Sequence, residues 1–408
     1  MKFKKFLITI NLITLKIPRL SVSENTFSKF IWNGFCQRYG KERAKKIVTS
    51  LSKPVKEFAI RTTLTKTTRK KVIEKLEYNN WKAKEHDVLS EMVTVRTQGM
   101  NYVPYLPTTP RLIIDKIASE SVFIGSNLYG VGIKRMPKFK IGQTVSLVSP
   151  IDQIVAIGEA KINSKTEKMK GIAVKTTNSF YNVPSIRDLG LLESGEGFSQ
   201  SIPAAYVAHV LAPKENETIV DLCAAPGGKS TSAAILSNDK ANIIAFDRSK
   251  KRLKKMERAI RNQGLKSIKI INADSIEYIK NHTVRADKVI VDPSCTAIGV
   301  RPKLYDETTE NDSINAANYQ KSFLWAAKKI VRKNGIITYS TCTMEPRENE
   351  KVVAYAVNEL NLELVKPMLL MGTKGEETGD GLEIDYLRRF YPDTFDTPGF
   401  FVAKLMRK

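Results

Sequence analysis

Two of the four cysteines directly follow apolar segments that read as buried strands. Cys342 lies in "TYSTCTMEPRENE" (338–350), and Cys295 lies in "KVIVDPSCTAIGV" (288–300), three residues after Asp292. A thiolate is a nucleophile, and a neighbouring carboxyl group can hold a substrate or move a proton. Alternatively, both thiols are small buried apolar groups, a common fate of free cysteine. Because open α/β sheets bind ligands beyond the carboxyl ends of their strands, the position of these cysteines favours a chemical role.

A glycine-containing turn lies earlier in the chain, in "DLCAAPGGKS" (221–230), between a predicted strand and a predicted helix. Glycines let the backbone approach a ligand, and the helix that follows presents free N–H groups. The turn is neither a Walker loop nor a GxGxxG motif, so it does not indicate a triphosphate or a dinucleotide. We predict that it lines a cofactor site with Cys223, Ala224, Ala225, Pro226, Gly227, Gly228 and Lys229.

Acidic residues end three of the predicted strands, namely Asp221, Asp247 and Asp274. An acid at the end of the second strand of such a sheet can hydrogen-bond ribose hydroxyls, which is the role predicted for Asp247. Asp274, at the end of the third, could accept from an adenine amino group. Each acid could instead cap the helix that follows it. Three such acids around a glycine turn favour a nucleoside cofactor.

The elements that position these residues alternate between strand and helix. Helices are predicted at 250–264, closed by Gly264, and at 316–335, closed by Gly335. Strand, helix and strand at this spacing give a parallel sheet covered on both faces, which is an α/β fold. The predicted strands are 218–222, 241–247, 267–274, 287–292 and 335–342.

The first half of the chain follows other patterns. Residues 110–184 contain short apolar segments separated by glycine, typical of a small barrel or sandwich, and residues 27–104 mix helices and strands. The first 25 residues mimic a signal peptide, but Lys16, Pro18 and Arg19 break the apolar stretch, so we expect them in the mature protein. No uninterrupted apolar run of about 18 residues predicts a membrane span.

The charge and the cysteines narrow the class of protein. The 408 residues hold 66 Lys and Arg against 42 Asp and Glu, a net charge of +24, which indicates a polyanionic partner such as nucleic acid. A lysine-rich proteome is the alternative. The cysteines form no CxxC pair, so the sequence indicates neither a zinc site nor disulfides, and a reducing cytoplasmic location fits.

The motifs "DLCAAPGGKS", "VDPSCTAIG" and "YSTCTMEPRENE", in this order, resemble those of the Sun/Fmu-type RNA cytosine-5 methyltransferases. The resemblance implies a Rossmann-like core that uses S-adenosylmethionine and acts on RNA rather than DNA. It implies that Cys342 adds to C6 of cytosine and that Cys295 assists product release. It also implies that Asp292, beside the cofactor, holds the cytosine edge and that Lys229 helps to fix the base.

Two features leave alternatives to these roles. The family usually has Asp-x-Pro-Cys where this chain has "DPSC" (292–295), so the proline is shifted although the spacing from acid to cysteine is kept. DNA cytosine-5 methyltransferases take their nucleophile from a Pro-Cys after the fourth strand, so Cys295 rivals Cys342 as the nucleophile.

The remaining segments resemble RNA-binding modules. Residues 110–184 resemble a PUA domain, residues 1–109 include an RRM-like subdomain, and residues 185–408 form the methyltransferase domain. A PUA domain in this position is similar to one branch of the family, which implies action at cytosine 72 of tRNA with the CCA end held by the PUA domain. The alternatives are an rRNA cytosine-5 methyltransferase and a non-catalytic RNA-binding protein. The sequence does not specify an oligomeric state.

Overall fold

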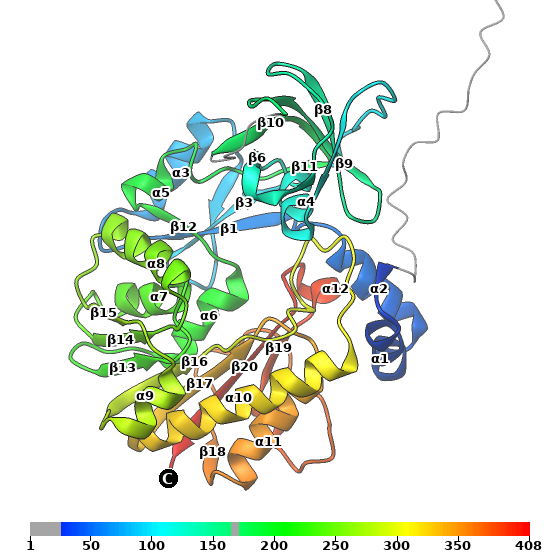
Figure 1. Cartoon of the computed structure of the whole chain (residues 1–408). Helices are drawn as coiled ribbons and strands as arrows, with labels where there is room; N and C mark the ends of the chain where they lie inside the picture. The colour runs from blue at the N-terminus through cyan, green and yellow to red at the C-terminus, as the bar shows by residue number, and fades with distance from the viewer. Residues whose placement is uncertain (1–25, 165–170) are drawn as a thin grey trace, which may run out of the picture. The chain divides into compact units, whose positions relative to one another are not determined.

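The computed structural model of the protein describes residues 26–164 and 171–408 (Figure 1). Packing divides the chain into two compact units. One contains Met100–Phe180, and the other combines residues 26–99 with Tyr181–Lys408. The prediction that the first 25 residues belong to the mature protein concerns a segment outside the described residues. The larger unit contains every predicted site residue.

A mixed α/β sheet forms the centre of the larger unit. The strand order is β15-β14-β13-β16-β17-β20-β18, with β19 paired to β20. Strands β13 to β17 are parallel, and β20 is antiparallel to β17. This arrangement confirms the predicted Rossmann-like class. The bounds are β13 Thr218–Asp221, β14 Asn242–Phe246, β15 Ile268–Ile271, β16 Ala286–Val291, β17 Val331–Thr341, β18 Leu362–Leu364, β19 Arg388–Phe390 and β20 Phe400–Arg407.

Helices cover both faces of this sheet (Figure 1). One face carries α6, α7 and α8, and the other carries α9, α10 and α11. Both faces of the parallel strands are therefore buried, which explains why these strands are almost continuously apolar in sequence. The bounds are α6 Ile202–Leu211, α7 Gly228–Leu236, α8 Lys250–Gln263, α9 Ser275–Asn281, α10 Glu310–Ile330, α11 Glu350–Asn358 and α12 Pro392–Phe395.

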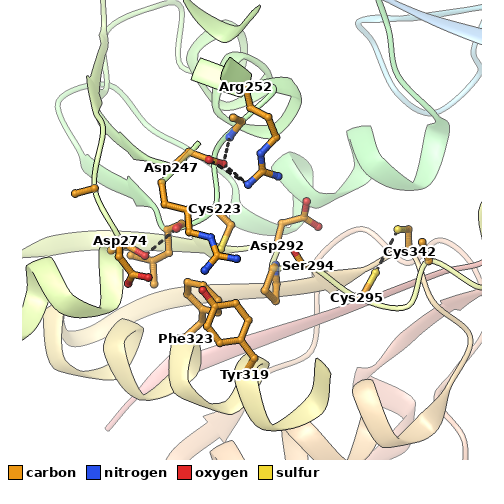
Figure 2. A pocket seen from close by; sticks show the side chains of 17 residues that line it. Cys223, Asp247, Arg252, Asp274, Asp292, Ser294, Cys295, Tyr319, Phe323 and Cys342 are labelled. Carbon is orange, nitrogen blue, oxygen red and sulfur yellow. Dashed lines mark hydrogen bonds and ion pairs between the residues drawn. The ribbon is translucent and has the colours of Figure 1, made fainter. Parts of the chain in front are cut away.

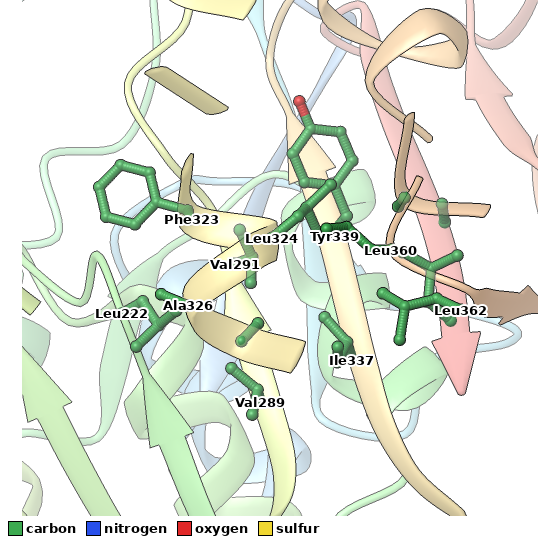
Figure 3. Close-up of a cluster of buried hydrophobic side chains, with 14 of the residues drawn as sticks. Leu222, Val289, Val291, Phe323, Leu324, Ala326, Ile337, Tyr339, Leu360 and Leu362 are labelled. Carbon is green, nitrogen blue, oxygen red and sulfur yellow. The ribbon is translucent and has the colours of Figure 1, made fainter. Parts of the chain in front are cut away.

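Helix α10 and strands β16 and β17 build the main apolar core (Figure 3). Val289 and Val291 share one face of β16 because side chains alternate along a strand, and they pack with Ile337 of β17 and Leu324 of α10. All four side chains are completely buried. The core therefore fixes the two strands whose carboxyl ends carry Cys295 and Cys342.

Two predicted helix boundaries have different outcomes. Gly264 closes α8 with a φ of +70°, which confirms that prediction. Helix α10, however, starts at Glu310 rather than at residue 316, because Thr309 and Asp312 form a reciprocal capping box. The sequence carries this signal as a threonine followed three residues later by an acid.

The predicted end of α10 at Gly335 was wrong. The helix ends at Ile330, and the chain passes directly into β17, so Gly335 lies inside the strand. A Cβ atom on Gly335 would lie 2.7 Å from the carbonyl oxygen of Asp287 on the neighbouring segment. Gly335 is therefore required by a close approach between two strands and does not cap a helix.

Residues 26–99 add three helices, α1 to α3, and most of a small sheet to the larger unit. The sheet order is β12-β1-β3-β2, and all of its pairings are antiparallel. The likeness of this segment to an RRM stays a prediction. The bounds are α1 Lys29–Tyr39, α2 Lys41–Leu51, β1 Glu57–Thr62, α3 Arg69–Tyr78, β2 Ala83–Glu85, β3 Met92–Arg96, β4 Gln98–Gly99, β11 Tyr181–Asn182, α5 Leu191–Ser194 and β12 Gly197–Ser199.

Arg61 of β1 ties this small sheet to the methyltransferase sheet. Its fully buried guanidinium donates to the carbonyl oxygen of Gly228 and to Thr231, both at the start of α7, each over 2.6 Å. Burial lowers the pKa of Arg61 to about 9. The segment before residue 100 thereby supports the turn predicted to bind the cofactor.

The smaller unit is built around one sheet of order β6-β10-β9-β8-β5-β7. Strands β5 and β8 are parallel, and the other pairings are antiparallel. Helix α4 (Lys116–Phe123) packs on β9. The short β patterns of the sequence are therefore confirmed. The bounds are β5 Arg111–Ile114, β6 Leu128–Tyr129, β7 Ile133–Arg135, β8 Thr144–Val148, β9 Ile154–Ala160 and β10 Ile172–Ser179.

Candidate active site

A cavity of about 300 Å³ lies at the carboxyl ends of the parallel strands (Figure 2). Its wall brings together predicted residues from across the sequence, namely Cys223, Ala225, Asp247, Asp274, Asp292, Cys295 and Cys342. The other predicted residues form the turn into α7 and its first positions, namely Ala224, Pro226, Gly227, Gly228 and Lys229. The sheet edge thus gathers both the predicted cofactor residues and the predicted catalytic residues.

The turn before α7 depends on glycine at one of its two glycine positions. Gly227 has a φ of +106°, and a Cβ atom there would lie 2.8 Å from Cγ of Met256. A Cβ atom on Gly228 would meet only ordinary contacts, the nearest being Phe198 at 3.6 Å. Gly227 is therefore required by the backbone and by packing, whereas the surrounding protein does not require glycine at position 228.

Asp221 stabilises the turn by hydrogen bonds and does not line the cavity. One carboxylate oxygen accepts from the N–H of Cys223 over 3.2 Å, and the other accepts from the hydroxyl of Ser230 over 2.6 Å. Burial raises the pKa of Asp221 to about 6. Asp221, the first of the three strand-end acids, is thus an anchor for the turn.

Asp247 connects β14 to the turn. It accepts from the N–H of Ala225 over 3.3 Å and from the N–H of Ser249 over 2.8 Å, and the guanidinium of Arg252 lies 3.0 Å away. Its carboxylate lies in the cavity wall and is almost fully buried. These contacts fix the orientation of the Asp247 carboxylate, so it can accept hydrogen bonds from a polar ligand in the cavity.

Asp274 combines capping with a place in the cavity wall. One carboxylate oxygen accepts from the N–H groups of Ile276 and Glu277, over 3.0 and 3.2 Å, and so caps α9. The sequence presented capping and ligand binding as alternatives. Because a carboxylate has two oxygens, one oxygen can cap the helix while the other faces a ligand.

The cavity wall also contains residues that were not predicted from the sequence, among them Arg248, Arg252, Tyr319 and Phe323. Figure 2 shows the rings of Tyr319 and Phe323 on the side of the cavity opposite Arg252. The two rings lie 4.8 Å apart in an edge-to-face arrangement on α10. The signal for them was the i, i+4 spacing of two aromatic residues on the helix that follows the Cys295 loop.

Asp292 and Lys229 form a partly buried ion pair beside the thiols. Ser340 donates to the other carboxylate oxygen of Asp292 over 2.7 Å. Burial opposes the charge of Lys229, but the adjacent Asp292 outweighs burial and raises the pKa of Lys229. Lys229 therefore stays an ammonium group that orients the carboxylate.

The sulfur atoms of Cys295 and Cys342 lie 3.3 Å apart. The hydrogen bond from Cys295 is the largest influence on Cys342 and lowers the pKa of its thiol, although burial acts against it. The same contact, together with burial, raises the pKa of Cys295 well above its ordinary value. The opposite directions of the two pKa shifts favour Cys342 as the thiolate of the pair and Cys295 as the partner that keeps its proton.

Buried polar contacts hold the loop that carries Cys295 to the segment after Cys342. Glu348 accepts from the N–H of Thr296 over 3.0 Å and from the side chain of Gln320 over 3.0 Å. Burial raises the pKa of Glu348. Breaking this contact should loosen the loop that carries Cys295.

A glycine pair fixes the backbone of Cys342. The N–H of Gly299 donates to the carbonyl oxygen of Cys342 over 3.0 Å. A Cβ atom on Gly299 would lie 2.1 Å from the carbonyl oxygen of Gly399, so only glycine fits there. Three loops far apart in sequence thus meet behind the two thiols.

The thiol pair gives a prediction that a titration can check. We expect the pKa of Cys342 to be lower in Cys295→Ser, which keeps a hydrogen-bond donor, than in Cys295→Ala, which removes it. Below its pKa, Cys342 should therefore react faster with iodoacetamide in the serine variant, because more of it is thiolate. Peptide mass spectrometry of Cys342 at several pH values measures this. Equal midpoints in the two variants would show that position 295 does not influence the thiolate.

Comparison with known proteins places this site in a family. The model of the family described as "16S rRNA methyltransferase RsmB/F" matches residues 208–406, and the PUA domain model matches residues 110–180. The tRNA (cytosine(72)-C(5))-methyltransferase of Pyrococcus horikoshii is 36% identical to this chain, over 93% of this chain and 97% of that protein. The chain belongs to this family of RNA cytosine-5 methyltransferases.

Two further matches agree with this membership. The mouse tRNA (cytosine(72)-C(5))-methyltransferase NSUN6 is 29% identical, over 72% of this chain and 74% of that protein. The crystal structure of NSun6 from Pyrococcus horikoshii with SFG has a TM-score of 0.85 and 36% identity, covering 94% of this chain and 99% of that one. The predicted family and PUA domain are confirmed.

S-adenosylmethionine is the cofactor of this methyltransferase family, and SFG is its analogue. The cavity has features that suit it. The backbone comes close at Gly227, carboxylates stand in the wall at Asp247 and Asp274, and aromatic rings stand at Tyr319 and Phe323. When bound, the cofactor supplies the methyl group. The chain's own residues would hold its ribose and its base and exclude water from the transfer.

We expect Asp247→Ala to weaken S-adenosylmethionine binding by at least about tenfold, because it removes a charged acceptor that also supports the turn at Ala225. Asp247→Asn is the matched control. It keeps one acceptor, so its loss of affinity should be smaller. Calorimetric titration measures both affinities. Unchanged affinity in Asp247→Ala would remove this residue from the site.

Proposed function

We propose that this methyltransferase methylates C5 of cytosine 72 near the acceptor end of tRNA and that its PUA domain holds the CCA end. The Pyrococcus horikoshii relative carries this tRNA activity in its name and matches almost the whole of both chains. The presence of a PUA domain supports an RNA end as part of the binding site. A base at a helix end is also easier to extract than an internal one.

The thiol pair beside Asp292 at the sheet edge is the main support for the proposed reaction. C5 of cytosine is a weak nucleophile. Addition of the Cys342 thiolate to C6 forms a sulfur–carbon bond and makes C5 enamine-like, so C5 can accept a methyl group. Asp292, oriented by Lys229 and Ser340, would hold the N3/N4 edge of the base.

The reaction then requires removal of the C5 proton and release of the base from the sulfur of Cys342. A base removes the proton from C5, the electron pair restores the C5–C6 double bond, and the bond from C6 to the sulfur of Cys342 breaks. Cys295 lies next to the departing sulfur and is assigned to this release step. Its raised pKa keeps it protonated until that point, so it does not compete for C6.

The proposal extends to the organisation of the chain. Residues 1–109 would form the N-terminal helical and RRM-like part, residues 110–184 the PUA domain and residues 185–408 the methyltransferase domain. A reducing cytoplasm would keep Cys295 and Cys342 as free thiols. Within the described part of the chain, no helix has the length and apolar character needed to cross a membrane.

Bisulfite sequencing tests the proposed substrate. Purified protein, S-adenosylmethionine and a mixture of unmodified tRNA and rRNA transcripts should give protection from conversion at cytosine 72 of tRNA. A tRNA in which only that cytosine is replaced by uridine is the control and should stay unmethylated. Protection confined to rRNA would support the rRNA alternative instead.

A further inference from the structure

A second cavity, of about 500 Å³, lies within the larger unit and shares no wall residue with the candidate active site. Its wall comes from β1 and β3, from the start of α6 and from the segment around α12. Three of its wall residues, Ile202, Met371 and Phe390, belong to the apolar cluster on which Cys342 also packs. The second cavity and the Cys342 thiol therefore border the same apolar cluster.

Thr94 of β3 is the feature that indicates a ligand. Its side chain lines this cavity and is only 4% exposed, and its hydroxyl has no hydrogen-bond partner among the residues that the structure describes. A buried hydroxyl without a partner is unfavourable, since it has lost its water. A polar group of a ligand in the cavity would satisfy it.

The same wall offers a second donor and a cation. Nδ1 of His86 accepts from the N–H groups of Val88 and Leu89, over 3.1 and 3.0 Å, which leaves Nε2–H as the free donor of the ring. Lys56 is exposed at the cavity and, within the described residues, has no carboxylate in ion-pairing distance. These groups suit a ligand with a polar edge and a nearby negative charge.

An aromatic ring completes the site. Phe395 lines the cavity with 37% of its surface exposed, and it packs edge-to-face on the buried Phe390, with 6.0 Å between ring centroids. An exposed ring supported from behind is suited to stacking on a flat heteroaromatic group. The two carboxylates in the wall already form ion pairs, Asp396 with Arg301 and Glu57 with Lys84.

We propose that this cavity binds an unstacked base of the RNA substrate, next in the chain to the cytosine that enters the active site. The inference rests on the proposed function. Extraction of one base deprives its neighbour of a stacking partner, and proteins bind such splayed bases by stacking and by hydrogen bonds to their edges. Phe395 supplies the stacking, Thr94 and His86 supply the edge contacts, and Lys56 faces the phosphate.

Thr94→Val separates a ligand contact from a structural role. Because the hydroxyl has no partner among the residues that the structure describes, its removal should leave the melting temperature unchanged or raise it. The same change should weaken RNA binding about three- to tenfold, the effect of one lost hydrogen bond. Thr67→Val is the matched control, since the buried hydroxyl of Thr67 also has no partner in the described part of the chain but lies outside the cavity. It should leave RNA affinity unchanged.

Phe395→Ala identifies the base. It should weaken binding of the intact RNA about tenfold, the effect of one lost stacking contact. RNAs with a single abasic nucleotide at each position next to the target are then compared. At one of these positions the abasic RNA should bind wild type and Phe395→Ala equally, because the stacking partner is already absent.

Three results would overturn the assignment. They are unchanged RNA affinity in both variants, an effect of Phe395→Ala that persists with every abasic RNA, and tight binding of free adenosine monophosphate that Phe395→Ala abolishes. The last would make the cavity a site for free nucleotides. Since the readout is RNA affinity, it is independent of methyl transfer. Failure of the proposed function would appear separately, as absent transfer by the wild-type protein.

Discussion

Cys342→Ala is expected to abolish methyl transfer and also any covalent protein–RNA adduct. Cys342 is the thiol of lowered pKa in the cavity wall, and without it C5 is not activated. The loss should be on the order of 10⁴-fold or more, as for other covalent catalysts that lack their nucleophile. Transfer of radiolabelled methyl groups to tRNA and denaturing gels measure the two effects.

The control for this variant is Cys36→Ala. Cys36 lies on α1 and does not line the cavity, so its removal should leave the rate unchanged. S-adenosylmethionine binding should also survive in Cys342→Ala, because the turn at Gly227 and the acid at Asp247 are intact. A Cys342→Ala protein that still forms an RNA adduct would exclude Cys342 as the only nucleophile.

Cys295→Ala should give the opposite result on the gel, namely a methylated covalent complex that accumulates. Attack by Cys342 and methyl transfer remain possible, but release by breakage of the C6–sulfur bond is impaired. The yield should approach one RNA per protein molecule, with turnover reduced by about 10² to 10⁴-fold, the range for loss of a positioned proton-transfer group. Radiolabelled tRNA reports the complex as a shifted band.

The thiol contact complicates this variant and also suggests its control. Since the contact with Cys295 lowers the pKa of Cys342, removal of the Cys295 thiol should also raise the pKa of Cys342 and slow the attack at neutral pH. Cys295→Ser keeps a donor, so it should form the complex faster than Cys295→Ala at neutral pH, and the two should converge at high pH. An adduct in Cys342→Ala together with none in Cys295→Ala would reverse the roles of the two cysteines.

Much of the site could be predicted from local sequence patterns. The apolar strands, the glycine turn at 227 and the acids at strand ends are local features, because each strand end and each cap depends on a few neighbouring residues. The sequence therefore predicts that Asp247, Asp292, Cys295 and Cys342 lie at one edge of the sheet, as they do. Arg252 was missed, although it lies only five residues after Asp247.

The order of the strands was decided by the tertiary structure alone. Cys295 and Cys342 are 47 residues apart, and their contact exists because β16 and β17 are neighbours in the sheet. Likewise β13 lies beside β16, which brings Lys229 to Asp292. Residue spacing does not encode which strands become neighbours, so neither the ion pair nor the thiol pair could be read from the sequence.

The sequence by itself determined the α/β class, the strand ends and the residue types for thiol chemistry, since periodicity and capping are set by nearest neighbours. Only the tertiary structure decided that Gly335 belongs to a strand, that Arg61 supports α7 and that Thr94 lines a second cavity. Each of these depends on contacts between segments far apart in the chain. Such contacts form when apolar faces pack together, and the local pattern does not specify their partners.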